Sequence, residues 1–360
     1  MTPDSPSTDT ALRRKRRDNV IAAIREAIAQ GRLRPGERLA SFAELRKQFK
    51  AGQTTVRRAL AKLQDLGFLE SRAEPGVFVA LAPPHVRNLG VVFPGHPSEP
   101  LTWSTFLTAI EAHVDRLAPR AGFKVIKFYR ALPDLNRPET RELRRLIDEH
   151  QLAGLLLASA QLLGSCEWLR LAALPRVVVW SQSMPGVPSV SVDDHAMFDL
   201  AFRRCHELGH RRVAVLLLNS RPQEAAKQIC LLAAEHGIMT PPHWVQGAAK
   251  DESGWAANVV ELLFRQPSRD RPDALFVTDD HLVTSATEGL LAAGVAVPAE
   301  VVVMAHCNIG FQPPTRVPAQ FLGFDGKKLV ATCLERLEQL QRGEAFPPLT
   351  LLPPRFVKPD

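Results

Sequence analysis

The amino-acid sequence predicts a small α+β domain followed by a larger α/β domain of two parallel-sheet lobes. Residues 18–80 show three helical patterns and then two short strands. From residue 89 to residue 360, short apolar runs alternate with helical patterns, as is typical of parallel strands covered by helices on both faces. We expect residues 1–17 to form a disordered basic tail and residues 81–88, which contain two adjacent prolines, to form a linker.

The first two helices of the small domain are predicted from spacing and end signals. Residues 19–30 place apolar side chains at helical spacing and stop before Gly31. Residues 42–50 follow Ser41, a residue type that caps helix N-termini well. The side chains expected on the inner face of this second helix are those of Phe42, Leu45 and Phe49.

A tight turn at residues 51–52 precedes the third helix, residues 54–63. Its apolar side chains fall on one face, which leaves small polar and basic side chains outside. Two short strands, residues 66–70 and 77–79, follow and are joined by a turn at Pro75–Gly76. Small polar and basic residues that begin a helix after a tight turn suit insertion into a DNA major groove, so the pattern predicts a winged helix-turn-helix.

The charge distribution agrees with this interpretation. Residues 1–80 contain 16 Lys and Arg against 9 Asp and Glu, so this segment carries the whole formal net charge of +7. Basic groups concentrated in one module are what a polyphosphate partner requires, because their contacts release counterions from the duplex. The alternative is a basic face that is only solvated. The run Arg13–Arg17 has the same two interpretations, an arm that follows phosphates or a solubilising tail.

Two parts of the chain resemble known families. Residues 19–79 resemble the winged helix-turn-helix of GntR-type regulators, and residues 88–357 resemble the periplasmic-binding-protein-like sensor domain of LacI/GalR regulators. The first resemblance rests on Gly31-Arg-Leu-Arg-Pro-Gly-Glu-Arg-Leu-Ala-Ser41, Thr54-Thr-Val-Arg-Arg-Ala-Leu60 and Leu66-Gly-Phe-Leu69. The second rests on Val192-Asp-Asp194, Leu208-Gly-His-Arg-Arg-Val-Ala-Val-Leu216, Asp273-Ala-Leu-Phe-Val-Thr-Asp-Asp280 and Gly294-Val-Ala-Val-Pro298. The combination is similar to the arabinose-repressor type.

The first resemblance implies a set of DNA-contacting residues: Ser41, Gln53, Thr54, Thr55, Arg57, Arg58 and Gly76. Gln53 departs from the family, which usually carries Arg at that position. Arg favours guanine and Gln suits adenine, so we expect an operator that differs from the usual one. Thr54, Thr55 and Arg57 are expected to bind phosphates and so fix the register of the helix on the DNA.

The sensor departs further from its family. The position where sugar-responsive members place an Arg that grips hydroxyls is Ala225, and their Gly-Phe-Asp is Ala305-His306-Cys307. Buried hydroxyls need paired donors and acceptors, so these replacements argue against a common monosaccharide effector. The residues expected to line the effector cleft instead are Trp103, Trp180, Asp280, His306 and Cys307. The alternatives are that the two Trp side chains are ordinary packing and that His306-Cys307 senses metal or redox state.

These features predict a regulator without catalytic activity, metal or cofactor. Phosphate-binding glycine loops, nucleophile elbows and metal-spaced His, Cys or carboxylate sets do not occur in the sequence. The five cysteines are scattered and no apolar run is long enough to cross a membrane, which favours a reduced cytoplasm. The resemblance implies a homodimeric repressor that binds a double-stranded operator and responds to a small-molecule effector. The alternative is a sensor that has lost sugar binding and responds to a protein partner.

Overall fold

The computed structural model describes residues 8–99, 103–130, 136–160, 162, 166, 168–169, 174–179, 182–218, 222–249 and 254–358. The chain divides into two compact units. The first unit comprises Met1–Pro94 and Ala118–Arg176, and the second comprises Gly95–Leu117 and Val177–Asp360. In the described part of the chain, no helix has both the length and the apolar character needed to span a bilayer.

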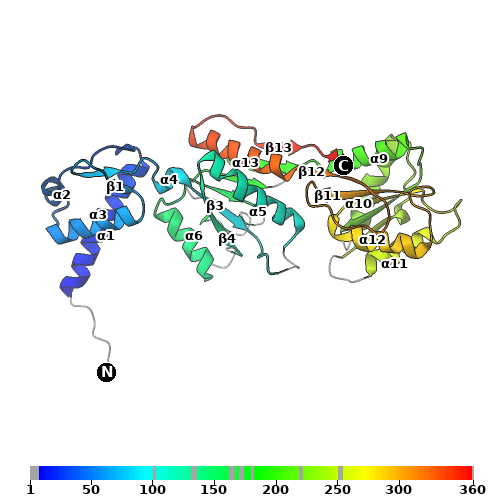
Figure 1. Cartoon of the computed structure of the whole chain (residues 1–360), viewed down its shortest axis with the longest axis horizontal. Coiled ribbons are helices and arrows are strands. Elements are labelled where there is room, and N and C mark those ends of the chain that lie inside the picture. The colour runs from blue at the N-terminus through cyan, green and yellow to red at the C-terminus, as the bar shows by residue number, and fades with distance from the viewer. Residues whose placement is uncertain are drawn as a thin grey trace, which may run out of the picture. The chain divides into compact units, whose positions relative to one another are not determined.

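The first unit begins with the small domain, which has the predicted three helices and hairpin (Figure 1). Its elements are α1 Thr8–Ala29, α2 Phe42–Phe49, α3 Gln53–Asp65, β1 Leu69–Ser71 and β2 Val77–Val79. β1 and β2 pair antiparallel, with Leu69 opposite Val79. The apolar faces of α1 and α3 form a common core that includes Val20, Ile28 and Leu60. Burial of this stripe at helical spacing is what the sequence predicted.

Two details of the small domain differ from the prediction. α1 begins at Thr8, so the run Arg13–Arg17 is helical where the sequence predicted a disordered tail. Neither Gly nor Pro occurs between Thr8 and Ala29, so nothing in that stretch stops the helix. Phe42 was expected on the inner face of α2, but it is 41% exposed, because this short helix buries Leu45 alone.

The first unit continues with α4 Pro84–Arg87, a single helical turn inside the predicted linker. Its further elements are β3 Asn88–Phe93, a 3₁₀ turn at Pro119–Ala121, β4 Lys124–Tyr129, α6 Pro138–Asp148 and β5 Gly154–Leu157. β3 pairs in parallel with both β4 and β5. Five of the six residues of β3 are buried, which explains why this strand is a continuous apolar run rather than an alternating one.

Three more strands belong to the same six-stranded sheet as β3, β4 and β5. These are β6 Arg176–Val179, β7 Ser189–Val192 and β13 Leu349–Leu352, with α5 Thr105–Leu117 packed against α13 Gly326–Gln341. The strand order of the whole sheet is β13-β7-β6-β5-β3-β4. β13 pairs in parallel with β7 and takes the edge of the sheet, so β7 is an interior strand.

The rest of the second unit forms the other predicted parallel-sheet lobe, with strand order β14-β12-β11-β10-β8-β9. Its strands are β8 Val213–Leu218, β9 Val245–Ala248, β10 Ala274–Val277, β11 Val302–Asn308, β12 Gln320–Phe324 and β14 Arg355–Phe356. Its helices are α9 Asp194–Glu207, α10 Pro222–Glu235, a 3₁₀ turn at Pro242–Trp244, α11 Trp255–Phe264 and α12 Asp280–Ala293. One apolar cluster joins α9 and α10 to one face of the sheet, and another joins α11 and α12 to the opposite face.

Close packing within this sheet explains one glycine. Gly323 on β12 lies opposite Cys307 on β11. A Cβ atom at position 323 would stand 1.7 Å from the carbonyl oxygen of Cys307, so a larger residue there would force the strands apart.

Candidate functional site

The N-terminal end of α3 is open to solvent and carries polar and basic side chains. Gln53 and Thr54 are exposed, and Thr55 is half-buried. Gly52 caps the helix without a side-chain hydrogen bond, so the first N–H groups of α3 lack a side-chain acceptor. Uncapped N–H groups at the positive end of a helix dipole form a ready site for an anion such as a DNA phosphate.

Two exposed guanidinium groups follow on the same helix. Arg57 and Arg58 form no ion pair with any described residue, whereas Arg17 and Arg72 are paired with Asp18 and Glu70. Val56 and Ala59, which flank Arg57 and Arg58 on α3, are fully buried, so one side of the helix is fixed in the core and the other side is open to solvent. Unpaired guanidinium groups on a fixed helix are available to phosphates and base edges.

Ser41 serves first as a helix cap. Its Oγ accepts a hydrogen bond from the Glu44 backbone N–H at 3.3 Å, and the Ser41 N–H donates to Glu44 Oε2 at 2.7 Å. Hydrogen bonds to the Glu44 carboxylate from the Ser41 side chain and, second, from the Ser41 backbone N–H lower the pKa of Glu44. The Ser41 side chain is exposed, so a phosphate could reach it at the surface.

Gly76 occupies the tip of the hairpin with φ +143°, a backbone conformation that suits glycine. A Cβ atom at this position would lie 2.8 Å from Nε of Arg38, so the guanidinium of Arg38 rests against the tip. The backbone N–H of Leu39 donates to Val77 and that of Val79 donates to Glu37, so the segment before Ser41 forms an isolated antiparallel bridge with β2. The sequence reasoning missed Arg38, although it lies within the motif quoted for the resemblance.

In the second unit, Asp280 and His306 come together at the carboxyl ends of β10 and β11. Asp280 is 6% exposed, and its Oδ2 accepts a hydrogen bond from Asn308 Nδ2 at 2.8 Å. The ring of His306 lies 5.7 Å from that of Phe324, and burial lowers the pKa of His306 although Asp280 opposes this shift. Cys307 is fully buried, and burial raises the pKa of its thiol to about 12, which makes the thiol unreactive.

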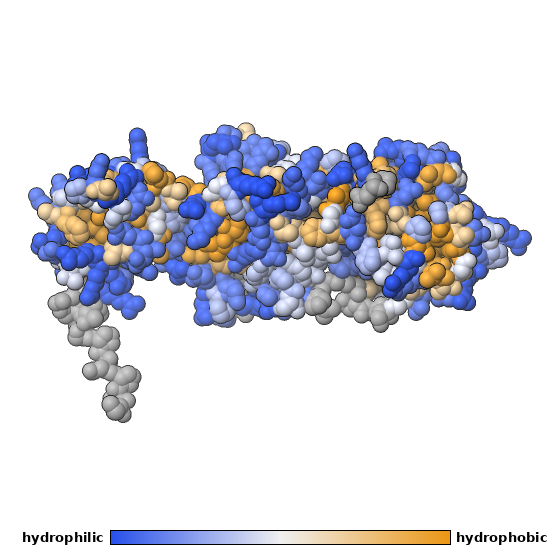
Figure 2. All heavy atoms as spheres, viewed as in Figure 1, coloured by the Kyte–Doolittle hydropathy of each residue, from blue (hydrophilic) through white to orange (hydrophobic). Residues whose placement is uncertain are grey.

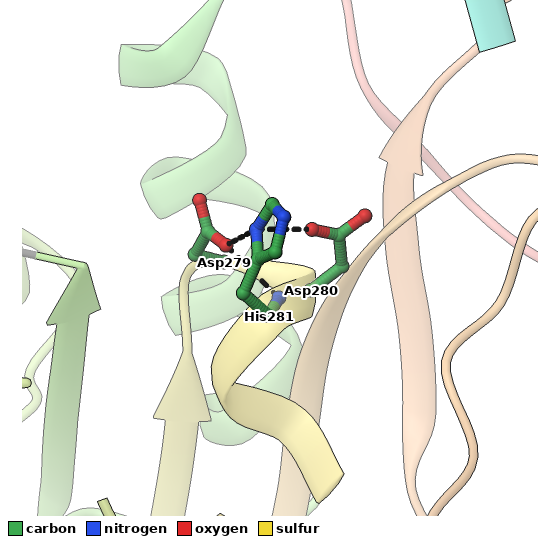
Figure 3. A group of neighbouring side chains, drawn as sticks. All are labelled: Asp279, Asp280 and His281. Atoms are coloured by element: carbon green, nitrogen blue, oxygen red, sulfur yellow. Dashed lines mark hydrogen bonds and ion pairs between the residues drawn. The ribbon is translucent and has the colours of Figure 1, made fainter. Parts of the chain in front are cut away.

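Figure 3 shows His281 held between two carboxylates at the start of α12. Nδ1 of His281 lies 2.7 Å from Asp279 Oδ1 and 3.1 Å from Asp280 Oδ1. These hydrogen bonds raise the pKa of His281 to about 9, so the ring is protonated at neutral pH. Among the described residues, this trio is the one group whose donor atoms could hold a metal ion, but the metal would have to displace the shared Nδ1 proton.

The two tryptophans proposed for the effector site are placed differently. Trp103 is buried, and its Nε1 donates a hydrogen bond to Thr108 Oγ1 at 2.8 Å, which engages the indole within its own segment. Trp180 lies outside the described residues. Of the five predicted effector residues, the structure therefore groups Asp280 with His306 and Cys307.

A pocket of about 710 Å³ lies in the second unit, between α9 and α10 and the carboxyl ends of β8 and β10. We call it the α9–α10 pocket. Its described lining includes Ala225, Asp194 and Asp279 but none of Trp103, Asp280, His306 and Cys307. The sequence contained a signal for it, because Val192-Asp-Asp194 and Thr278-Asp-Asp280 each place carboxylates just after a strand. Hydrophobic residues reach the surface in patches among hydrophilic ones (Figure 2). Leu231 on α10 is 60% exposed.

Comparisons with known proteins agree with both domains. Residues 16–79 match the family of bacterial regulatory proteins named gntR, and residues 202–358 match the periplasmic binding protein-like domain. The arabinose metabolism transcriptional repressor of Geobacillus stearothermophilus is 23% identical over 312 residues, which is 81% of each chain.

Solved structures show the same fold for the larger domain. A LacI family transcriptional regulator from Lactobacillus casei with bound glucose has a TM-score of 0.52 at 19% identity and covers 75% of this chain and 98% of its own. The transcription regulator CcpA of Lactococcus lactis has a TM-score of 0.52 at 17% identity, over 76% and 98%. The chain therefore joins an N-terminal GntR-type helix-turn-helix domain to a LacI-like, periplasmic-binding-protein-like domain of two parallel-sheet lobes.

Proposed function

We propose that this protein is a DNA-binding transcriptional repressor whose affinity for its operator is controlled by a small molecule bound in the C-terminal domain. The observation that carries the first half is the free end of α3, where uncapped N–H groups adjoin Arg57 and Arg58. The similarity to an arabinose metabolism transcriptional repressor over most of both chains supports the same function.

Each residue of the interface has a proposed role. Thr54, Thr55 and Arg57 hold phosphates and set the position of α3 in the major groove. Gln53, at the first position of α3, reads a base edge and favours adenine. Ser41 and Arg58 add phosphate contacts, and Gly76 lets the hairpin backbone approach the minor groove. A homodimer would place two such helices on a near-palindromic site, with half-sites about one helical turn apart.

Selection of genomic fragments by the purified full-length protein tests this proposal. The expected result is a short near-palindrome whose recovery is lost when Thr54→Ala and Arg57→Ala are combined. A matched control replaces Thr284 and Arg203, which lie on α12 and α9, and should leave the selected site unchanged. Recovery of sequence-random DNA alone, or of the same site by the α3 variant, would contradict the proposal.

The effector half is tested separately. A compound that binds the C-terminal domain should change the operator dissociation constant, and by linkage the operator should change the affinity for that compound by the same factor. An operator affinity that no bound compound alters would contradict effector control while leaving DNA binding intact.

A further inference from the structure

We propose that the α9–α10 pocket takes an amphipathic organic cation, a compound with one protonated amine and an apolar body. This inference rests on the proposed effector control, since it names the chemical class of the effector. It is carried by three properties of the pocket: its size, its apolar wall and the sign of the charges at its rim.

The wall of the pocket is apolar and comes from three elements. α9 contributes Met197 and Phe198, the end of β8 contributes Leu217, and α10 contributes Ile229 and Leu232. A volume of about 710 Å³ lies within the usual range for small-molecule sites. Such a wall favours a hydrocarbon or aromatic body, because binding removes both apolar surfaces from water.

The charged groups of the lining are acidic. Asp194 begins α9, Glu235 ends α10 and Asp279 caps α12, and all three line the pocket. Among the described lining residues there is neither Lys nor Arg, and His195 is the one side chain that can become positive. Ala225 occupies the place where the family resemblance leads one to expect an Arg, so a guanidinium that would repel a cation is missing.

Nearby groups change this balance only in part. Protonated His281 is paired with Asp279 and Asp280 together, which leaves one negative charge on that trio. The N-termini of α9 and α12 each contribute about half a positive charge. Asp193, the N-cap of α9, adds a further carboxylate beside Asp194. The described groups at the rim therefore carry a net negative charge, and an ammonium group fits them better than a neutral or anionic group does.

The environment of Asp194 also favours a bound cation. Burial and the neighbouring Asp193 raise the pKa of Asp194. Both causes disfavour its charged form, and a bound ammonium would relieve them. The fit thus joins an apolar wall with carboxylates that have no Lys or Arg beside them among the described lining residues.

Three ligands that share a ring and a two-carbon side chain test the charge preference. Isothermal titration of the full-length protein would compare 2-phenylethylammonium, 2-phenylethanol and phenylacetate. We expect the ammonium compound to bind at least about tenfold more tightly than the alcohol, which is the ratio expected for one charge-assisted hydrogen bond. Phenylacetate should bind more weakly than either of the others.

Variants locate the effect in the pocket. Asp279→Asn keeps a good N-cap residue for α12 and Asp194→Asn is nearly isosteric, so both should fold. Together they should abolish the preference for the ammonium compound, while Ala225→Arg should shift it towards phenylacetate. Asp270→Asn, in an exposed pair with Arg269 outside the pocket, is the matched control and should bind as wild type does.

The outcomes separate this proposal from the proposed function. Equal binding of the three ligands, a preference for the alcohol or the acid, or no binding of the ammonium compound would overturn the cation proposal. So would an unchanged preference in the Asp194→Asn, Asp279→Asn double variant. Operator binding is measured on the same preparation without ligand, so its loss would count against the repressor alone.

Discussion

The N-terminus of α3 and the N-termini of α9 and α12 carry opposite chemistry. α3 begins after Gly52 with no side-chain cap, and its exposed guanidinium groups are unpaired among the described residues. α9 and α12 are capped by Asp193 and Asp279, and each has another Asp at its first position. An uncapped basic helix end suits an anion, whereas a helix end already supplied with two carboxylates does not. The residues at the helix end, more than the helix dipole, set the charge of the partner.

The largest expected effect comes from reversing the charge at α3. Arg57→Glu removes a cation and places a carboxylate against the phosphates, so we expect operator affinity to fall at least about 100-fold. Fluorescence anisotropy at several salt concentrations should also show a salt slope smaller by about one or more. Arg203→Glu on α9 is the control and should leave affinity nearly unchanged. An unaltered affinity in Arg57→Glu would place the DNA elsewhere.

The acidic end of α12 should make the stability of the C-terminal domain depend on pH through His281. Its folded-state pKa of about 9 exceeds the ordinary value of 6.5, so its contribution is complete below pH 6.5 and is lost as the pH rises through 9. The shift sets an upper limit of about 3 kcal/mol. Because every Trp lies beyond residue 100, tryptophan fluorescence during urea unfolding reports this domain.

His281→Gln removes this titration. The variant should lose less stability than wild type between pH 6 and pH 9.5, and the difference between the two proteins isolates the histidine from other titrating groups. Parallel pH profiles for the two proteins would show that the pairing in Figure 3 contributes no net stability.

Gln53 tests whether α3 reads bases as well as phosphates. Gln53→Ala should lose about 1–3 kcal/mol of discrimination at one operator position, and Gln53→Arg should move the preference there towards guanine. Binding-site selection with each variant measures this. Gln64→Ala, at the other end of α3 and bonded to Ser71, is the control. Identical selected sites for Gln53→Ala and wild type would show that Gln53 reads no base and at most contacts phosphates.

The smallest effect concerns Ser41, the uncharged N-cap residue of α2. Ser41→Ala should destabilise α2 by about 1 kcal/mol, seen as faster hydrogen exchange of its amides. Ser41→Asp should keep the cap yet weaken operator binding, because it gives α2 the same acidic beginning as α9 and α12. Equal operator affinity in Ser41→Asp and wild type would remove Ser41 from the interface.

The sequence predicted most elements correctly because their signals are local. Ser41, the apolar spacing of α1 and α3, and the turn at Pro75–Gly76 act within a few residues. β12, β13 and β14 were missed. β13 lies between two pairs of prolines, and its partner β7 is distant in sequence, so only tertiary pairing reveals it. Propensity carries little information for such strands.

The site residues also divide into those that a local pattern identifies and those that only tertiary structure brings together. Those of α3 could be chosen from one helix, since the alternation of buried and exposed positions separates core from surface. The α9–α10 pocket depends on how two helices and two strand ends meet, and no single stretch contains it. Cys307 illustrates the limit, because adjacent strand residues point to opposite faces and the sequence does not show that its side chain is sealed in the core.

The pairing of β13 with β7 also has a consequence for biosynthesis. The small domain emerges from the ribosome first and contains its own core, so it can fold while the rest is being translated. The first sheet of the larger domain must wait for residues 349–352, and until then β7 presents an unpaired edge. A message truncated shortly before that point would yield a folded small domain attached to an aggregation-prone remainder.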